Sequence, residues 1–89
     1  MTVAERFSEN LLILRRRAGL SQEDVGFAAS LHRTEIGQLE SGDRLPRIDT
    51  LVKLAGALGV TPCELLKGLD WKPGAERPGR FRIEGEGGS

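Results

Sequence analysis

The sequence predicts an all-α fold in which five short helices form one compact domain, followed by a C-terminal tail of different character. Over residues 1–68, apolar residues recur at intervals of three and four, and glycine or proline separates each stretch from the next. Over residues 69–89, two prolines and five glycines accompany "RFRI", which alternates charge with bulk and does not suit a helix. We therefore expect a helical domain over 1–68 and a separate tail over 69–89.

The first helix is expected over residues 3–18, where apolar residues at helical spacing share one face. Three arginines in its last turn suit the negative end of the helix dipole, and Gly19 is a natural stop. The residues of the apolar face are Ala4, Phe7, Leu11, Leu14 and Ala18.

The second helix is expected to start after Ser21, which is a good N-cap, with Asp24 three residues later as in a capping box. Gly26 lies in the middle of this helix, where glycine costs roughly 1 kcal/mol against alanine. We therefore expect a close-packing reason for this glycine. The short apolar face consists of Val25, Ala28 and Ala29.

Two further helices are expected after the proline of the sequence "DRLPR". The fourth helix ends at Gly59, and Thr61 and Pro62 begin the fifth, with proline at the favoured first position and Glu64 as a capping partner. The fifth helix is expected to end at Gly68. The inward residues of the fourth helix are Ile48, Leu51, Leu54, Ala55 and Leu58.

The tail leaves two alternatives open. It is either loosely ordered, or a small hairpin that joins "LDW" to "RFRIE" across the Pro-Gly turn residues. An exposed pair of strands would be a ready site for pairing with a second subunit. Its apolar residues, Trp71, Phe81 and Ile83, either form an interaction surface or fold back to extend a small core.

Composition excludes several classes of protein. Eighty-nine residues suit one small domain, and 13 basic against 13 acidic side chains give a formal net charge of zero, unlike a non-specific nucleic-acid binder. With one cysteine, no apolar leader and no long apolar run, we expect a soluble cytoplasmic protein that does not enter a membrane. One histidine and one cysteine, far apart, predict no enzyme, metal site or cofactor, and Cys63 is expected to be part-buried.

The third helix, which begins at His32 or Arg33 and ends before Gly42, turns Ile36 and Leu39 inward. Together with the second helix it makes a unit over residues 21–41 with the geometry of a helix-turn-helix. Its outer face carries groups that suit base edges: arginine for guanine, glutamine for adenine, threonine for a thymine methyl and glutamate for cytosine. Spacing alone leaves open an ordinary solvated helix face.

A longer resemblance supports the DNA-binding interpretation. The run over residues 14–68 resembles the XRE/Cro-CI helix-turn-helix family of bacterial and phage transcriptional regulators. The matching features, in order, are Arg15, "GLSQE" at 19–23, Ile36 and Leu39, "LE.G" at 39–42, Pro46 and "L..LA.ALGV" at 51–60. The resemblance implies a lambda-repressor-like domain that binds specific DNA sequences, with residues 33–41 as the recognition helix.

The resemblance also implies roles for single residues. Base contacts are expected from the start of the recognition helix, with one glutamate at the edge of the set: Arg33, Thr34, Gln38 and Glu35. Contacts to the DNA backbone are expected from residues around it: Gln22, His32, Arg44 and Arg47. Arg15 and Glu40 match a largely buried ion pair that ties the first helix to the third.

Departures from the family pattern qualify this interpretation. Ser30 stands at a turn position usually held by glycine, where a positive φ would cost of order 1 kcal/mol. His32 replaces the usual Ser or Thr cap, so that it either caps less well or reaches a phosphate when protonated. Residues 21–45 hold two arginines and five acids, a net charge of −3, which predicts weak non-specific affinity.

We therefore expect a homodimer that binds double-stranded DNA and adds two half-sites together, without a small-molecule effector. The alternative is a protein-interaction module, antitoxin-like or an adaptor, that keeps this fold without binding specific DNA. Zero net charge favours the alternative, whereas the intact Gln22, Arg33 and Gln38 oppose it.

Overall fold

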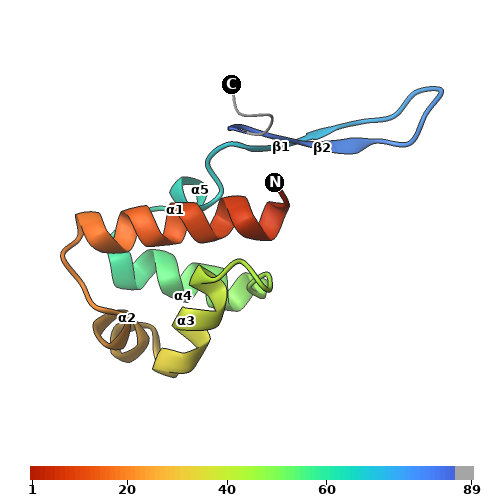
Figure 1. The fold of residues 1–89 in the computed structure, drawn as a ribbon. Coiled ribbons are helices and arrows are strands. Elements are labelled where there is room, and N and C mark those ends of the chain that lie inside the picture. The colour runs from red at the N-terminus through yellow and green to blue at the C-terminus, as the bar shows by residue number, and fades with distance from the viewer. Residues whose placement is uncertain (86–89) are drawn as a thin grey trace.

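The computed structural model describes residues 1–85, which form five helices and a two-stranded hairpin (Figure 1). The all-α domain is as expected, and the hairpin alternative for the tail is confirmed. Residues 86–89 of the predicted tail lie outside the described residues. The elements are α1 (Val3–Arg17), α2 (Gln22–Ala29), α3 (Arg33–Glu40), α4 (Ile48–Leu58), α5 (Pro62–Leu65), β1 (Leu69–Lys72) and β2 (Arg80–Ile83).

Local hydrogen bonds explain where the helices begin. At α2 the backbone N–H of Asp24 donates to Ser21 Oγ at 3.0 Å, and the N–H of Ser21 donates to Asp24 Oδ2 at 2.9 Å, which is the predicted capping box. The same reciprocal arrangement joins Thr2 and Glu5 at α1. α5 is shorter than expected: it ends at Leu65, whereas the predicted end is Gly68.

All five helices contribute to one core. α1 packs against α3 and α5, while α2 packs against α3 and α4, so that α1 lies between α5 and the α2–α3 pair (Figure 1). Each fully buried side chain of this size contributes about 1.5–3 kcal/mol of transfer free energy. The largest fully buried side chains are Phe7, Leu11, Val25, Ile36, Leu39, Leu54 and Leu65.

Four predictions of burial are wrong. Ile48 is 81% exposed because it is the first residue of α4, at the end of the helix that lies beyond the packed turns. Ala28 is exposed because α2 turns Val25, Gly26 and Ala29 inward instead, and Ala18 is exposed because α1 ends before it. Cys63 is exposed rather than part-buried.

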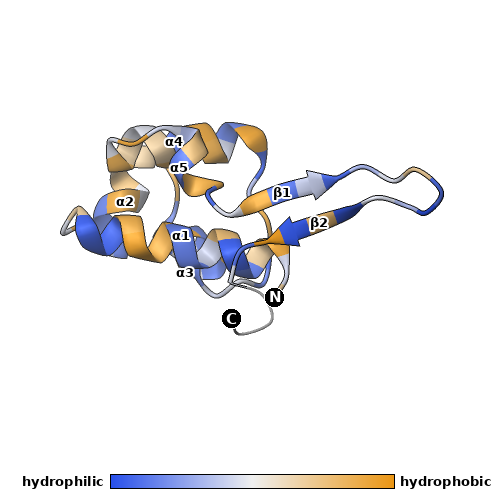
Figure 2. Cartoon of the chain, turned by 90° about the horizontal axis from the view of Figure 1, so that it is seen from above, coloured by the Kyte–Doolittle hydropathy of each residue, from blue (hydrophilic) through white to orange (hydrophobic). Residues whose placement is uncertain are grey.

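The hairpin projects away from the helices, as the view from above shows (Figure 2). Its antiparallel register pairs Leu69 with Ile83 and Trp71 with Phe81. β2 contacts α1 and its Ile83 is buried, so the fold-back alternative holds for Ile83. Trp71 and Phe81 remain exposed, and an interaction surface there stays a prediction.

Two side chains of α1 hold the base of the hairpin. Asn10, which is buried, donates from Nδ2 to the carbonyl oxygens of Leu65 at 2.9 Å and Lys67 at 2.8 Å. Arg6 Nε donates to the same Lys67 oxygen at 3.1 Å. These bonds satisfy carbonyl groups left without helical partners where α5 ends. In residues 1–85 no helix combines the length and hydrophobicity that crossing a membrane requires.

Candidate nucleic-acid interface

A close backbone approach sets the angle between α2 and α3. A Cβ atom on Gly26 would lie 2.8 Å from the carbonyl oxygen of Leu31, in the turn between the two helices. This is the expected packing reason for a glycine within α2. The turn itself passes through Ser30, whose φ of 55° is left-handed, as the departure from the family pattern predicts.

The exposed face of α3 presents the predicted base-reading groups. Arg33, Thr34 and Gln38 are exposed, whereas Glu35 is half-buried. The opposite face of the same helix is anchored by Ile36 and Leu39, which are 0% and 1% exposed. The core therefore holds α3 by one side and leaves polar groups of several kinds on the other.

His32 caps α3 through its ring. The backbone N–H of Thr34 donates to His32 Nδ1 at 3.1 Å, so this nitrogen acts as an acceptor. In the neutral imidazole the proton then resides on Nε2, which is left as a donor on an exposed side chain. The ring can therefore cap the helix and offer an N–H outward at the same time, without being protonated.

The loop after α3 is tied back to the recognition helix. Arg44 Nη1 donates to Gln38 Oε1 at 2.9 Å, which joins an expected backbone contact to an expected base contact. Ser41 Oγ donates to Asp43 Oδ2 at 2.8 Å and closes the loop further. Arg47, at the start of α4, is exposed and lies 3.4 Å from Asp49 through Nε and Oδ1.

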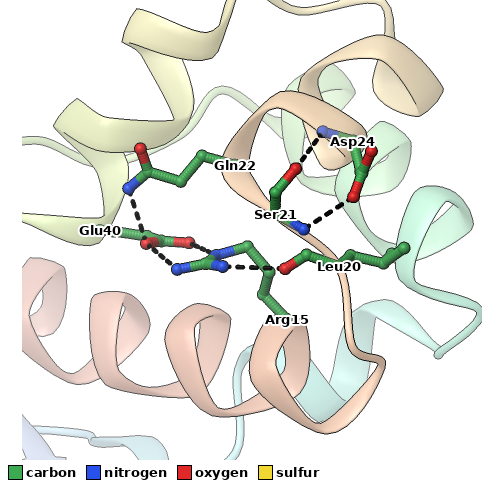
Figure 3. A network of polar contacts seen from close by, with 6 residues as sticks. All are labelled: Arg15, Leu20, Ser21, Gln22, Asp24 and Glu40. Atoms are coloured by element: carbon green, nitrogen blue, oxygen red, sulfur yellow. Dashed lines mark hydrogen bonds and ion pairs between the residues drawn. The ribbon is translucent and has the colours of Figure 1, made fainter.

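A network of polar contacts fixes α3 and the start of α2 on α1 (Figure 3). Arg15 donates through Nε and Nη2 to the two carboxylate oxygens of Glu40, and through Nη1 to the carbonyl oxygen of Leu20 at 2.9 Å. Gln22 Nε2 also donates to Glu40 Oε1, at 3.1 Å. The hydrogen bonding of Arg15 to the Glu40 carboxylate raises the pKa of the Arg15 guanidinium.

The structure therefore places Gln22 within this network. One amide N–H of Gln22 is used by Glu40, and the second is left for another acceptor. Gln22 and Arg33 line one shallow hollow of about 270 Å³ between the starts of α2 and α3, together with Arg15, Ser21 and Glu23. Two expected DNA-contacting residues thus lie beside one concave surface.

Sequence reasoning missed the bond between Arg44 and Gln38, because it joins a loop to a helix and carries no periodic signal. It also missed exposed apolar side chains on the neighbouring helices: Phe27 of α2 is 91% exposed, and Ile48 and Val52 of α4 are 81% and 54% exposed. Phe27 lies two residues after the buried Val25, and residues two apart face nearly opposite sides of a helix, so its place on α2 could have indicated exposure. Within residues 1–85, no group of three or more metal-binding side chains occurs.

A helix anchored on its apolar side, with polar groups outward and a tightly packed partner helix, is typical of the helix-turn-helix class of DNA-binding domains. The chain belongs to the helix-turn-helix family, whose model matches residues 11–65. The resemblance to XRE/Cro-CI regulators is thereby confirmed.

Curated relatives agree with this assignment. The chain is 37% identical over 73 residues to the HTH-type transcriptional regulator y4dJ of Sinorhizobium fredii, covering 82% of this chain and 95% of that protein. It is 42% identical over 50 residues to the control protein C.BamHI of Bacillus amyloliquefaciens, covering 56% of this chain and 62% of that protein.

A solved structure matches the fold as well. The restriction-modification controller protein C.AhdI of Aeromonas hydrophila superposes with a TM-score of 0.68 at 39% identity, over 70% of this chain and 94% of that one. The family match ends at residue 65, so the hairpin lies beyond it.

Proposed function

We propose that this protein is a transcriptional regulator that binds specific DNA sequences as a homodimer, with α3 in the major groove. The observation that carries the proposal is the arrangement of α3, where Ile36 and Leu39 are buried and Arg33, Thr34 and Gln38 face outward. Phosphate binding alone would need only positive charge, whereas this face holds donors, acceptors and a methyl group.

Each outward side chain suits a particular base edge. Arg33 can donate two hydrogen bonds to O6 and N7 of guanine, and Gln38 can pair with N6 and N7 of adenine. Thr34 offers its methyl group to thymine. Glu35 can accept from N4 of cytosine, and its half-buried side chain supports a role at the edge of the proposed reading face.

The backbone contacts come from residues that surround α3. Gln22 retains one amide N–H beyond its bond to Glu40, and His32 presents Nε2–H when Nδ1 caps the helix. Arg44 and Arg47 flank the loop after α3, and Arg47 is 86% exposed along its side chain. These donors would fix the register of α3 in the groove without reading sequence.

A homodimer follows from the small number of cations. Residues 21–45 carry a net charge of −3, so one copy neutralises few phosphates and binds non-specific DNA weakly. Two copies on adjacent half-sites add their base contacts. We propose that the chain acts without catalysis, metal or small-molecule effector, and that the adaptor or antitoxin-like function is the less favoured alternative.

The test is selection of bound DNA from a random duplex pool at roughly physiological salt, which preserves specific contacts while weakening non-specific ones. The chain, the double variant Arg33→Ala/Gln38→Ala and the control Arg77→Ala are compared. Arg77 lies in the loop between β1 and β2, so the control loses the same charge far from α3 (Figure 1). We expect a motif with two related half-sites that the double variant loses and the control keeps.

Two results would contradict the proposal. An unenriched pool would favour the protein-interaction alternative, since the intact reading face would then have no sequence to read. A motif that survives the double variant would show that sequence is read by a surface other than α3.

A further inference from the structure

Among the described residues, no strand pairs with the outer edge of β1, where Trp71 presents its backbone. Glu84 N donates to the carbonyl oxygen of Gly68 at 2.8 Å, one position before the register pair Leu69 and Ile83. Because hydrogen-bonded and non-bonded pairs alternate in an antiparallel ladder, the backbone of Trp71 faces away from β2. Consistently, the N–H of Trp71 donates to the side chain of the preceding residue, Asp70 Oδ1, at 3.2 Å rather than to β2. Pairing with a further strand would exchange this local bond for one to a backbone carbonyl oxygen.

One face of the hairpin is apolar and uncovered. The rings of Trp71 and Phe81 meet edge to face with centroids 5.0 Å apart, and each residue is 54% exposed. They lie on the same face as Ile83, which is only 8% exposed and packs against α1. A Cβ atom on Gly79 would collide with Trp71 Cζ2, so this glycine leaves the space that the indole fills.

We propose that β1 pairs antiparallel with β1 of a second copy, with Trp71 opposite the partner's Trp71. The two hairpins then form one four-stranded sheet in the order β2-β1-β1-β2. The proposal deepens the homodimeric regulator proposed above, and rests on it for the choice of a second copy as the occupant of this edge.

Charge complementarity supports this register. Centring the pair on Trp71 places Asp70 opposite the partner's Lys72, and Lys72 opposite the partner's Asp70. Opposite charges directly across two strands stabilise their pairing. The same operation on the outer edge of β2, centred on Phe81, would place Arg80 opposite the partner's Arg82, and like charges there are destabilising. In the proposed sheet Asp70 would lie between the partner's Lys72 and Arg82 of its own hairpin, whose Nη2 is 3.4 Å from Asp70 Oδ2. The β1 edge is therefore self-complementary, and the β2 edge is not.

The proposed sheet also arranges the aromatic residues. Phe81 pairs with Trp71 within each hairpin, and the two Trp71 residues would meet across the new junction. A row of four aromatic side chains would then cross one face of the sheet. Aromatic cross-strand pairs contribute beyond the burial of their area, and each ring would lose exposed surface.

The direction of the hairpin suits a DNA-binding dimer. In Figure 1 the hairpin lies on the opposite side of α1 from α2 and α3, and its two strands overlap there but are seen side by side from above in Figure 2. The two-fold axis of an antiparallel strand pair in one sheet is perpendicular to that sheet. Both helical domains would then lie on the same face of the sheet, and both copies of α3 would lie on the side of their domains that is farther from the sheet.

Disulfide trapping tests the register directly. In a Cys63→Ser background, we would compare Asp70→Cys/Lys72→Cys with the matched pair Arg80→Cys/Arg82→Cys under oxidised glutathione at low protein concentration. Positions 70 and 72 would form non-hydrogen-bonded pairs across the junction, with Cα atoms about 4.5 Å apart, a separation that a disulfide can span. We expect a covalent dimer from the first variant only.

Both variants are first checked by circular dichroism, so that only folded protein is oxidised. Equal trapping in the two variants, or trapping in the β2 variant alone, would overturn the β1 register. No trapping in either folded variant would exclude the hairpin as the dimer contact.

Charge exchange gives a second, non-covalent test. Asp70→Lys alone and Lys72→Asp alone each place like charges across the junction, and we expect each to weaken self-association about tenfold in sedimentation equilibrium. An equimolar mixture should associate again, because the introduced lysine of one variant would face the introduced aspartate of the other. A mixture no tighter than either variant alone would overturn the proposal.

Both tests are read without DNA, which separates this proposal from the proposed function. If the hairpins fail to pair while the duplex selection still yields two half-sites, the regulator dimerises elsewhere and only the β1 junction is wrong. If they pair while the selection yields no motif, the junction stands and DNA readout is wrong.

Discussion

Arg15 and Glu40 join α1 to α3 through two parallel hydrogen bonds, with Arg15 Nη2 at 3.0 Å from Glu40 Oε1. Their side chains are only 14% and 6% exposed. The fork geometry matches the guanidinium to both carboxylate oxygens, and Gln22 adds a third donor to the carboxylate. The recognition helix is therefore positioned by a charge pair as well as by apolar packing.

Replacing Arg15 by alanine is expected to destabilise the fold strongly. The substitution leaves the Glu40 carboxylate nearly buried with Gln22 as its remaining partner, and stranding one member of such a pair costs about 3–5 kcal/mol. Urea unfolding followed by circular dichroism measures the free energy. Arg16→Ala, an exposed neighbour, serves as the control and should change it by no more than about 0.5 kcal/mol. Equal losses in the two variants would contradict the structural role of the pair.

Gly26→Ala is expected to disturb the angle between α2 and α3. The added methyl group would meet the Leu31 carbonyl oxygen at 2.8 Å, and such overpacking costs about 1–3 kcal/mol. Gly56→Ala is the matched control, because a Cβ atom there meets nothing within 4 Å and the helix should gain about 1 kcal/mol. Thermal unfolding compares the two. A neutral or stabilising Gly26→Ala would mean that α2 and α3 do not need this close approach.

The capping box of α2 is expected to weaken in acid. The backbone N–H of Ser21, followed by its hydroxyl, lowers the pKa of Asp24 below its ordinary value. Because the folded pKa lies below the unfolded one, the contribution of Asp24 is complete above about pH 5 and is lost as the pH falls through the folded value. Asp24→Asn should therefore differ most from the original protein near neutral pH, and the two should converge in strong acid.

Melting temperatures measured from about pH 7 down to about pH 2 would show this convergence. Glu23→Gln, one residue earlier, is the control because the Glu23 side chain is outside the capping box. A difference between Asp24→Asn and the original protein that stays constant over the whole range would exclude a charged cap.

Arg47→Ala and Arg33→Ala are expected to affect DNA binding in different ways. Removing a phosphate contact weakens all sequences alike and lowers the slope of log affinity against log salt by about 1, whereas removing a bidentate base contact costs about 1–3 kcal/mol for the preferred sequence alone. Fluorescence anisotropy on matched and scrambled duplexes at several salt concentrations separates the two effects. Sequence selectivity lost in Arg47→Ala but kept in Arg33→Ala would reverse the proposed roles.

Arg44→Ala should combine both effects, because Arg44 also bonds to Gln38 Oε1. We expect a lower salt slope together with weaker discrimination at the base that Gln38 is proposed to read. A change in slope alone would show that the bond between these two side chains does not order the reading face.

Local signals explain what could be predicted from the sequence. The starts of α2 and α3 depend on residues within three positions of the cap, so Ser21, Asp24 and His32 indicate them without knowledge of the fold. Ser30 and Gly26 were informative because each departs from an otherwise consistent pattern, and both departures have a backbone cause in the structure.

Features that depend on distant packing could not be predicted. Ile48 continues the apolar spacing of α4, but as the first residue of that helix it is 81% exposed, so spacing alone predicts its burial wrongly. Asn10 interrupts the apolar face of α1, and its purpose depends on carbonyl groups more than fifty residues away. The expected contacts to DNA are not tested by a structure of the protein alone, and they stay predictions.

Asn10 and Arg6 of α1 hold the junction between α5 and the hairpin. Three hydrogen bonds from α1 reach the Leu65 and Lys67 carbonyl oxygens and so set the direction in which the hairpin leaves the helical body. In a hairpin-linked pair, that direction would govern how far apart two recognition helices stand, while α3 alone would govern which bases they read. The distance between the two half-sites and the bases within each half-site would then depend on separate residues. Either could change in evolution while the other is kept.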